Sequence, residues 1–261
     1  MQISYYEMQA AGNRIVVVDR RNEDATAPTP VQIKMFAEDS NVADFDQLMW
    51  VYDASQPGSL AAYRVFNNDG SEVEQCGNGV RCVAHILAVD GGEAFTLDSP
   101  VGPIDVRISA SSEVSVGMGV PTFETAALSA CGQSFEVSLV SMGNPHCVLQ
   151  VDDVQTADVA TLGPAIEHHE RFPQRINVGF MHVRNRSNID LRVYERGAGE
   201  TLACGTGACA AVVAGQRMGL LEQSVNVFLP GGQLVVSWRG SHASVWLSGD
   251  AELLSEGIID L

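Results

Sequence analysis

The chain has 261 residues, 46% of them hydrophobic, which is enough to bury a substantial core in one large domain or two small ones. With 32 acidic and 15 basic residues its formal net charge is −17, which argues against nucleic acids and anionic membranes as partners. No secretory signal and no run of about 20 apolar residues is visible, so we expect a cytoplasmic protein that does not enter a membrane.

Short β-rich runs dominate the first half of the chain. They predict strands at 3–8, 14–19, 48–52, 64–66, 95–98, 104–108 and 114–118. Helical patterns are expected at 30–38 and at 79–89, the second ending before Gly91 and Gly92.

The second half repeats this alternation. Strands are predicted at 135–140, 147–151, 177–183, 189–194, 225–229, 234–238 and 244–247, and helices at 157–170 and 206–218. The hairpin-like spacing predicts an α+β fold in which a mainly antiparallel sheet or barrel wraps around one long helix per half. Residues 119–121 are the expected domain boundary.

A long motif occurs once in each half. Residues 64–79 (RVFNNDGSEVEQCGNG) align without a gap on residues 192–207 (RVYERGAGETLACGTG), at an offset of 128 residues. The identical pairs are Arg64/Arg192, Val65/Val193, Glu72/Glu200, Cys76/Cys204, Gly77/Gly205 and Gly79/Gly207. A duplication of half the chain predicts two similar domains related by a pseudo-two-fold axis.

Cys204 stands where a glycine-rich turn gives way to a run of small residues that predicts a helix. The unpaired N–H groups and the dipole of a helix N-terminus favour negative charge. Such surroundings can lower a thiol pKa from about 8.5 to roughly 3.5–7.5, which makes the thiol a usable base. The alternative is that Cys204 is only a small turn residue before a core helix. The second copy of the motif, at Cys76, favours a catalytic thiol over this alternative.

Two such thiols, one per domain, would face one another across an interdomain cleft, where ligand sites are common. One could remove a proton from a carbon while the other delivers a proton to the opposite face, which inverts a stereocentre. The carbanion needs stabilisation, and pyridoxal phosphate, the usual electron sink, needs a Schiff-base lysine. The one lysine, Lys34, lies in an ordinary amphipathic segment, so we expect no cofactor and assign the stabilisation to the helix N-termini.

The other cysteines and the histidines form no metal pattern. There is no CxxC pair and no H-x-x-x-H spacing, so neither a zinc site nor a disulfide framework is expected. The remaining cysteines are expected to be small buried hydrophobes: Cys82, Cys131, Cys147 and Cys209.

Four motifs stand out along the chain: CGNG at 76–79, SMGNPH at 141–146, RINVGF at 175–180, and ERGAGET with CGTG at 195–207. Together, and over nearly the whole chain, they resemble the diaminopimelate epimerase family. The resemblance implies a first epimerase half at 1–119 that also takes the tail 250–261, and a second half at 120–249. It implies an isomerase that interconverts LL- and meso-diaminopimelate in lysine and peptidoglycan-precursor biosynthesis, with a possible homodimer.

The resemblance also implies the site. Cys76 and Cys204 would be catalytic, and His146 and Glu195 would modulate their pKa values, a protonated histidine lowering a thiol pKa and a carboxylate raising it. The implied substrate-binding residues are Asn13, Gln47, Asn67, Gly77, Asn78, Asn144, Asn177, Glu195, Arg196, Gly205 and Thr206. Taken singly, each amide could be a turn residue, His146 a turn histidine, and Arg196 the partner of a nearby acid.

Two loops depart from the family pattern, at 8–14 and at 42–47, and both are expected to shape the substrate pocket. Two other functions therefore stay open: a proline or hydroxyproline racemase of the same fold, and an amino-acid-binding relative without turnover. A cysteine-based redox or metal protein is a further alternative that the cysteine spacing disfavours.

Overall fold

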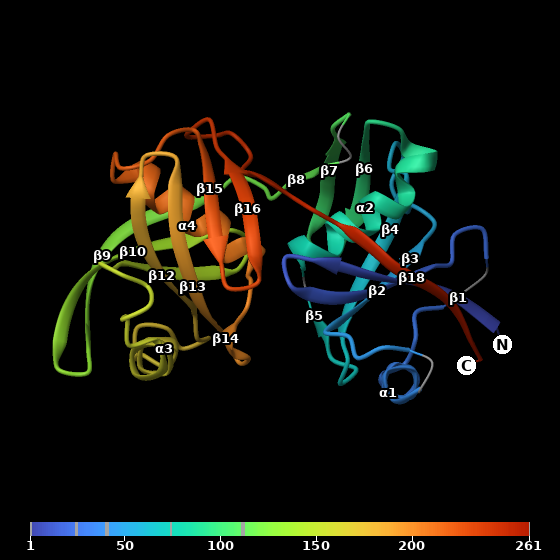
Figure 1. Ribbon diagram of the computed structural model, residues 1–261, viewed down its shortest axis with the longest axis horizontal. Helices are drawn as coiled ribbons and strands as arrows, with labels where there is room; N and C mark the ends of the chain where they lie inside the picture. The colour runs from blue at the N-terminus through green and yellow to red at the C-terminus, as the bar shows by residue number, and fades with distance from the viewer. Residues whose placement is uncertain (1, 24–25, 40–41, 74, 111–112, 261) are drawn as a thin grey trace. The chain divides into compact units, whose positions relative to one another are not determined.

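The computed structural model describes residues 2–23, 26–39, 42–73, 75–110 and 113–260 (Figure 1). The chain divides into two compact units. Unit 1 comprises Met1–Gly117 and Ser248–Leu261, and unit 2 comprises Met118–Leu247. That the halves 1–119 and 120–249 each contribute one part of a catalytic site stays a prediction.

Unit 1 is a sheet wrapped around one helix. Its elements are β1 (Gln2–Ala10), β2 (Asn13–Asp19), α1 (Pro30–Glu38), β3 (Gln47–Tyr52), β4 (Ala61–Asn67), β5 (Glu72–Val73), α2 (Gly77–Gly91), β6 (Ala94–Ser99), β7 (Gly102–Ile108), β8 (Val114–Gly117) and β18 (Glu252–Asp260). Strands β2 and β3 pair in parallel, as do β4 and β6, whereas β1 pairs antiparallel with both β2 and β18.

Helix α2 is the central element of unit 1. It packs against β1, β2, β3 and β8, and its first eight residues are all buried. The sheet approaches closely because the helix begins with glycines: a Cβ on Gly79 would lie 2.3 Å from the Met49 sulfur. The outer helix α1 buries Ile33 and Phe36 in a separate cluster with Tyr5 and Trp50.

Unit 2 repeats this arrangement. Its elements are β9 (Thr122–Ala130), β10 (Gln133–Ser141), β11 (Pro145–Gln150), α3 (Val159–Glu167), β12 (Asn177–Asn185), β13 (Asn188–Glu195), β14 (Gly199–Thr201), α4 (Gly205–Arg217), β15 (Ser224–Leu229) and β16 (Gly232–Ser237). The boundary at residues 247 and 248 falls inside β17 (Trp246–Gly249). Strands β11 and β12 pair in parallel, as do β13 and β15, and β12 and β13 pair antiparallel.

Helix α4 is buried on every side except in its last two residues. All eleven residues from 205 to 215 are buried, and they are Gly, Ala, Val, Cys and Thr. A helix that is apolar all round has no solvent face, so it lies in the middle of its unit. It packs against β10, β11, β12, β13 and β16, and a Cβ on Gly215 would lie 2.3 Å from a Leu221 methyl group.

The strand register is equivalent in the two units. Ile15 in β2 pairs with Gln47 at the start of β3, and His146 in β11 pairs with Asn177 at the start of β12. The next strand of each set, β4 or β13, runs back and ends at Asn67 or Glu195. Each set therefore brings three strand ends together beside the N-terminus of the central helix.

The predicted α+β fold class is confirmed, with corrections in detail. Two nine-residue strands, β9 and β18, were not predicted, because most of their residues are exposed and their apolar alternation is weak. Cys131 was expected to be buried but is exposed, since it forms the tip of the β9–β10 hairpin with φ +51°.

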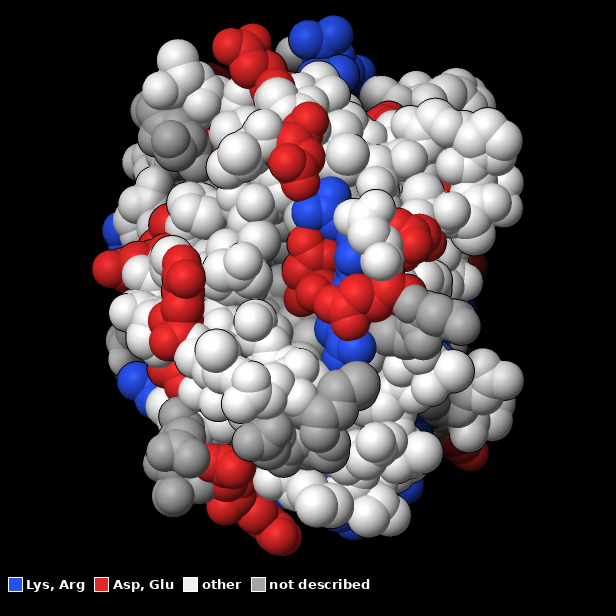
Figure 2. All heavy atoms as spheres, turned by 90° about the vertical axis from the view of Figure 1, so that its right-hand side faces the viewer, with Lys and Arg blue, Asp and Glu red and all other residues white. Residues whose placement is uncertain are grey.

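Within the described ranges, the helices are all too short or too polar to cross a membrane. On the face shown in Figure 2, Lys and Arg side chains lie between Asp and Glu side chains.

Candidate active site

Cys76 is the N-cap residue of α2. Its extended backbone, with φ −138° and ψ 105°, places the side chain over the first helical turn, where the Gly79 N–H donates to Cys76 Sγ at 3.2 Å. The sulfur therefore acts as a hydrogen-bond acceptor at the positive end of the helix dipole. Cys76 is half-buried, so a ligand can reach it.

A hydrogen-bond chain orders the first turn of α2. Asn78 Nδ2 donates to Asn13 Oδ1 at 3.0 Å, and Arg81 Nη2 donates to Asn78 Oδ1 at 3.0 Å. The guanidinium of Arg81, which is fully buried, also donates to the carbonyls of Gly77 and Asp250. Sequence reasoning missed Arg81, because its position inside an apolar helix is evident only once the helix is known to be enclosed.

The amides of unit 1 meet at the strand ends. Gln47 Nε2 donates to Asn67 Oδ1 at 3.5 Å, and Asn67 Nδ2 donates to Ser71 Oγ at 3.0 Å. Gln47 Oε1 is buried and has no hydrogen-bond partner among the described residues. A buried acceptor without a partner costs free energy, so this atom is a place where a ligand donor would be stabilising.

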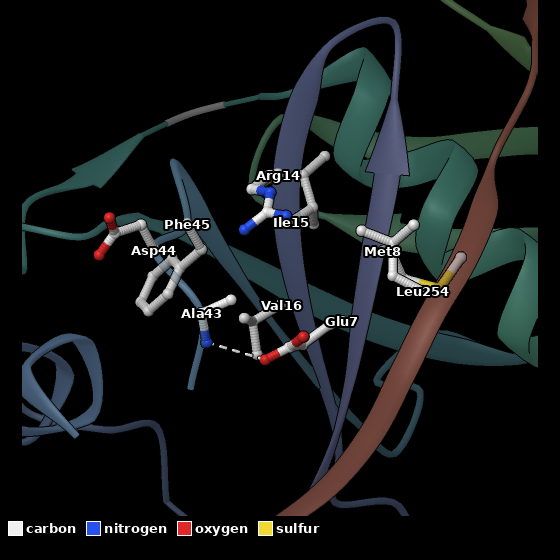
Figure 3. Close-up of a pocket in the computed structure, with 9 residues that line it drawn as sticks. All are labelled: Glu7, Met8, Arg14, Ile15, Val16, Ala43, Asp44, Phe45 and Leu254. Carbon is white, nitrogen blue, oxygen red and sulfur yellow. Dashed lines mark hydrogen bonds between the residues drawn. The ribbon is translucent and has the colours of Figure 1, made fainter. Parts of the chain in front are cut away.

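The segment 42–47, which differs from the family pattern, is fixed by hydrogen bonds near these amides. Glu7 Oε1 accepts the Ala43 N–H at 2.9 Å and Glu7 Oε2 accepts the Ser255 hydroxyl at 2.6 Å. Figure 3 shows the pocket between this loop and the β1–β2 hairpin, with the Glu7 contact to Ala43. None of its nine lining residues is a predicted site residue, but five of them lie in the segments 8–14 and 42–47, which were expected to shape the substrate pocket: Met8, Arg14, Ala43, Asp44 and Phe45. That expectation stays a prediction.

Cys204 is the N-cap residue of α4, in a backbone conformation close to that of Cys76. Its surroundings differ, because the thiol donates to Glu195 Oε2 at 3.2 Å and lies 3.6 Å from Thr206 Oγ1. Only 6% of Cys204 is exposed. Burial and then the charge of Glu195 raise the pKa of Cys204 well above its ordinary value. The expected lowering by the helix N-terminus is therefore outweighed at this thiol.

His146 is linked to Cys204 through two side chains. Its Nε2 lies 3.1 Å from Asn144 Oδ1, and Asn144 Nδ2 donates to Thr206 Oγ1 at 3.3 Å. Burial and then the charge of Arg196 lower the pKa of His146 to about 3. With this low pKa the ring carries no charge near neutral pH with which to lower a thiol pKa, and the pKa-modulating role of His146 stays a prediction.

The turn after β13 is held by two side-chain acceptors. Asn177 Oδ1 accepts the Arg196 N–H at 2.9 Å, and Glu167 Oε1 accepts the Gly197 N–H at 2.8 Å. Glu167 is 2% exposed and was not predicted, because its place in α3 shows no link to the turn in sequence. The Arg196 side chain is exposed, and no carboxylate of the described residues lies within ion-pair distance of it. The Arg196 guanidinium is therefore not paired with Glu195, whose carboxylate oxygens accept from Thr201 and Cys204.

The structure therefore groups the predicted residues by unit. Unit 1 brings together Cys76, Gly77, Asn78, Asn13, Gln47 and Asn67. Unit 2 brings together Cys204, Gly205, Thr206, Glu195, Arg196, Asn144, His146 and Asn177. Each group contains one thiol, one helix N-terminus and a set of strand-end amides.

Comparisons with known proteins show the family of the chain. The family model described as "Diaminopimelate epimerase" matches residues 5–124 and 138–254. A diaminopimelate epimerase of Alkalilimnicola ehrlichii is 45% identical over 279 residues, and the alignment covers 100% of both chains. One of Thioalkalivibrio sulfidiphilus is 44% identical, again over 100% of both chains.

Solved structures share the fold at low sequence identity. A PhzF-family phenazine biosynthesis protein of Enterococcus faecalis superimposes with a TM-score of 0.74 at 18% identity and covers 100% of both chains. A hydroxyproline epimerase of Agrobacterium vitis superimposes with a TM-score of 0.72 at 13% identity, covering 99% of this chain and 92% of that one. Identities this low support the fold alone.

Proposed function

The chain belongs to the diaminopimelate epimerase family, and we propose that it interconverts LL- and meso-diaminopimelate by proton transfer between one α carbon and the thiols of Cys76 and Cys204. Membership of this family makes it an isomerase. The observation that carries the mechanism is the contrast between the thiols. Both sulfurs receive a backbone N–H, from Gly79 at Cys76 and from Gly207 at Cys204, but the Cys204 thiol also donates to the Glu195 carboxylate.

This contrast supports one thiolate and one thiol at rest. In the first direction the Cys76 sulfur takes the α proton, so a C–H bond breaks and an S–H bond forms. The Cys204 S–H bond then breaks and a C–H bond forms on the opposite face of the carbon. The enzyme finishes with the two protonation states exchanged, and the reverse reaction restores them. The proposal requires both thiols to reach one carbon from opposite sides.

Backbone N–H groups would stabilise the carbanion. Helices α2 and α4 both begin directly after their cysteine, so each has orphan N–H groups in its first turn. A carboxylate bound there, and the enolate that develops from it, would accept hydrogen bonds from these N–H groups. The helix already orients the N–H groups, so they need not reorganise during the reaction. One such donor stabilises a transition state by on the order of 3–4 kcal/mol in measured cases. Several donors acting together would therefore make the α C–H acidic enough without a pyridoxal cofactor.

The strand-end amides and Arg196 would bind the distal amino-acid centre. Arg196 has the planar fork that pairs with a carboxylate in two hydrogen bonds. Gln47 Oε1, the buried acceptor, suits an ammonium donor. The remaining polar contacts would come from Asn13, Asn67, Asn144 and Asn177. This second charged centre distinguishes the substrate from proline, which has a single carboxylate and amine.

Deuterium labelling tests the two-base reaction. LL-diaminopimelate incubated in D₂O should give meso product carrying deuterium at the inverted carbon, while unreacted substrate keeps its hydrogen early in the reaction. Retention of the original hydrogen in the product would exclude two separate thiols. Binding without exchange would identify a non-catalytic relative. A panel including proline and hydroxyproline, resolved by chiral chromatography, should show turnover of diaminopimelate alone.

Mild oxidation without substrate tests whether the thiols share one carbon. Two sulfur atoms that reach the same carbon are near enough to form a disulfide. Oxidation should therefore link Cys76 to Cys204, and activity should be lost reversibly. Peptide mapping that found both thiols free after the loss would contradict the proposal.

We further propose that the enzyme acts in the cytoplasm and forms a homodimer. Leu254 and Ile258 on β18 are exposed apolar residues that support a contact between copies. Light scattering at micromolar concentration should give twice the mass of one chain.

A further inference from the structure

The Glu195 carboxylate has a separate hydrogen-bond partner on each oxygen. Oε2 accepts from the Cys204 thiol at 3.2 Å, and Oε1 accepts from the Thr201 hydroxyl at 2.6 Å. We propose that Thr201 is a positioning residue that fixes Glu195 so that one oxygen always faces the Cys204 thiol. This inference rests on the proposed function, because it concerns how Cys204 exchanges its proton.

The hairpin after β13 brings the hydroxyl to the carboxylate. Strands β13 and β14 pair with Val193 opposite Thr201 and Glu195 opposite Gly199, across a turn with Gly197 at φ +79°. An ionised carboxylate can only accept, so the Thr201 hydroxyl must donate to it. Such charge-assisted hydrogen bonds are short and strong, and this one leaves Oε2 directed at the thiol.

The equivalent residues of unit 1 lack both groups. With the offset of 128 residues, Glu195 corresponds to Asn67 and Thr201 corresponds to Val73. The backbone register is the same, because Val65 pairs with Val73 as Val193 pairs with Thr201. At these two positions, the carboxylate and the hydroxyl therefore occur together in unit 2, where the Cys204 thiol donates to the carboxylate, whereas unit 1 carries an amide and an isopropyl group.

The other charged groups near the turn have different partners. The Arg192 guanidinium pairs with Glu200, and Glu167 accepts the Gly197 N–H. The exposed Arg196 side chain follows Glu195 in the turn, and His146 on β11 is neutral. Among the described residues, the hydrogen bonds to the Glu195 side chain come from Thr201 and Cys204.

Fixing Glu195 matters at both stages of the reaction. Before Cys204 donates, the carboxylate holds the S–H hydrogen bond and keeps the thiol protonated. After donation, the same oxygen must stand ready to accept the S–H again when the thiol regains a proton. Without the Thr201 hydroxyl, the carboxylate is free to rotate away. Burial still raises the pKa of Cys204, but the second cause, the nearby charge of Glu195, is weakened.

Thr201→Val tests the proposal with little change of shape. Valine has the same branching as threonine, and unit 1 carries valine at the equivalent position. We expect kcat to fall about 10-fold with KM changed less than about 2-fold, as for loss of one hydrogen bond to a charged group. Thr201→Ser keeps the hydroxyl and should retain most of the activity. Val73→Thr in unit 1 is the matched control and should behave as the wild type.

Two further readouts separate positioning from general structural support. Alkylation by iodoacetamide, followed peptide by peptide against pH, should show Cys204 reacting at lower pH in Thr201→Val while Cys76 is unchanged. In a double-mutant cycle, Thr201→Val should have no further effect on kcat once Glu195 is changed to Gln.

The inference is overturned if Thr201→Val keeps the wild-type kcat and Cys204 alkylation profile, or if its effect persists in full beside Glu195→Gln. If Thr201→Val does not fold, Thr201→Ala removes the same hydroxyl without a larger group and is judged by the same outcomes. Failure of the proposed function is distinguishable, since it would appear as absent epimerisation in the wild type itself.

Discussion

The two units share a backbone plan but give their thiols different surroundings. Cys76 is half-buried and accepts a backbone N–H, whereas Cys204 is 6% exposed and donates to Glu195. Within the central helices, the fully buried Arg81 of α2 corresponds to Cys209 of α4. Strand register and the cysteine helix caps are therefore the same in both units, whereas the charged groups around each cap differ. A two-base reaction needs that divergence, because the resting thiols must differ in protonation.

Removing either thiol should have the largest effect. Cys76→Ala and Cys204→Ala should each lower epimerisation by at least about 10³-fold, because general acid–base groups contribute roughly 10²–10⁴-fold. Chiral chromatography of the product measures the loss. Substantial activity in either variant would mean that the two units are not equal partners in the chemistry.

Arg81 should be the next most sensitive position. Arg81→Met removes the N–H groups that donate to oxygens of Asn78, Gly77 and Asp250, so these buried acceptors lose a partner. We expect the free energy of unfolding to fall by about 3 kcal/mol. The matched change in unit 2, Cys209→Ala, should cost about 1 kcal/mol. Urea unfolding measures both. Equal losses would show that the buried guanidinium does not distinguish the units.

His146 should make unit 2 sensitive to acid. The pKa of His146 is about 3 in the folded chain and about 6.5 when unfolded, so the unfolded chain takes up a proton first as pH falls. This contribution is complete above pH 6.5 and is lost as pH falls towards 3, with a slope of at most about 1.4 kcal/mol per pH unit. His146→Gln should flatten the dependence, measured by urea unfolding across this range. Unit 1 has Ile15 at this register, so it provides no such dependence.

The smallest effect is expected at Cys82. This buried thiol corresponds to Ala210 in unit 2, so Cys82→Ala installs the residue that the other helix already carries. Activity should stay within about 2-fold, with a stability loss of about 1 kcal/mol for the small cavity. A large loss of turnover in steady-state assays would show that Cys82 has a role that the comparison does not indicate.

Much of this organisation could be predicted from the repeat and the motifs. Helix α1 has the predicted bounds, and α2 and α4 begin at the predicted glycine-rich turns. Exposed strands such as β9 could not be predicted, since their pairing is decided by neighbouring strands rather than by an apolar pattern. Glu167 and Arg81 also escaped prediction, because burial depends on what packs against a side chain.

The amino-acid sequence by itself determined the duplication, the two cysteine caps and the resemblance to the diaminopimelate epimerase family. These features depend on local residue order, which short-range helix and turn chemistry can express. Only the tertiary structure decided which groups surround each thiol. The Glu195 contact, the neutral His146 and the Thr201 hydroxyl depend on strand register and burial, and those fix distances and solvent exposure.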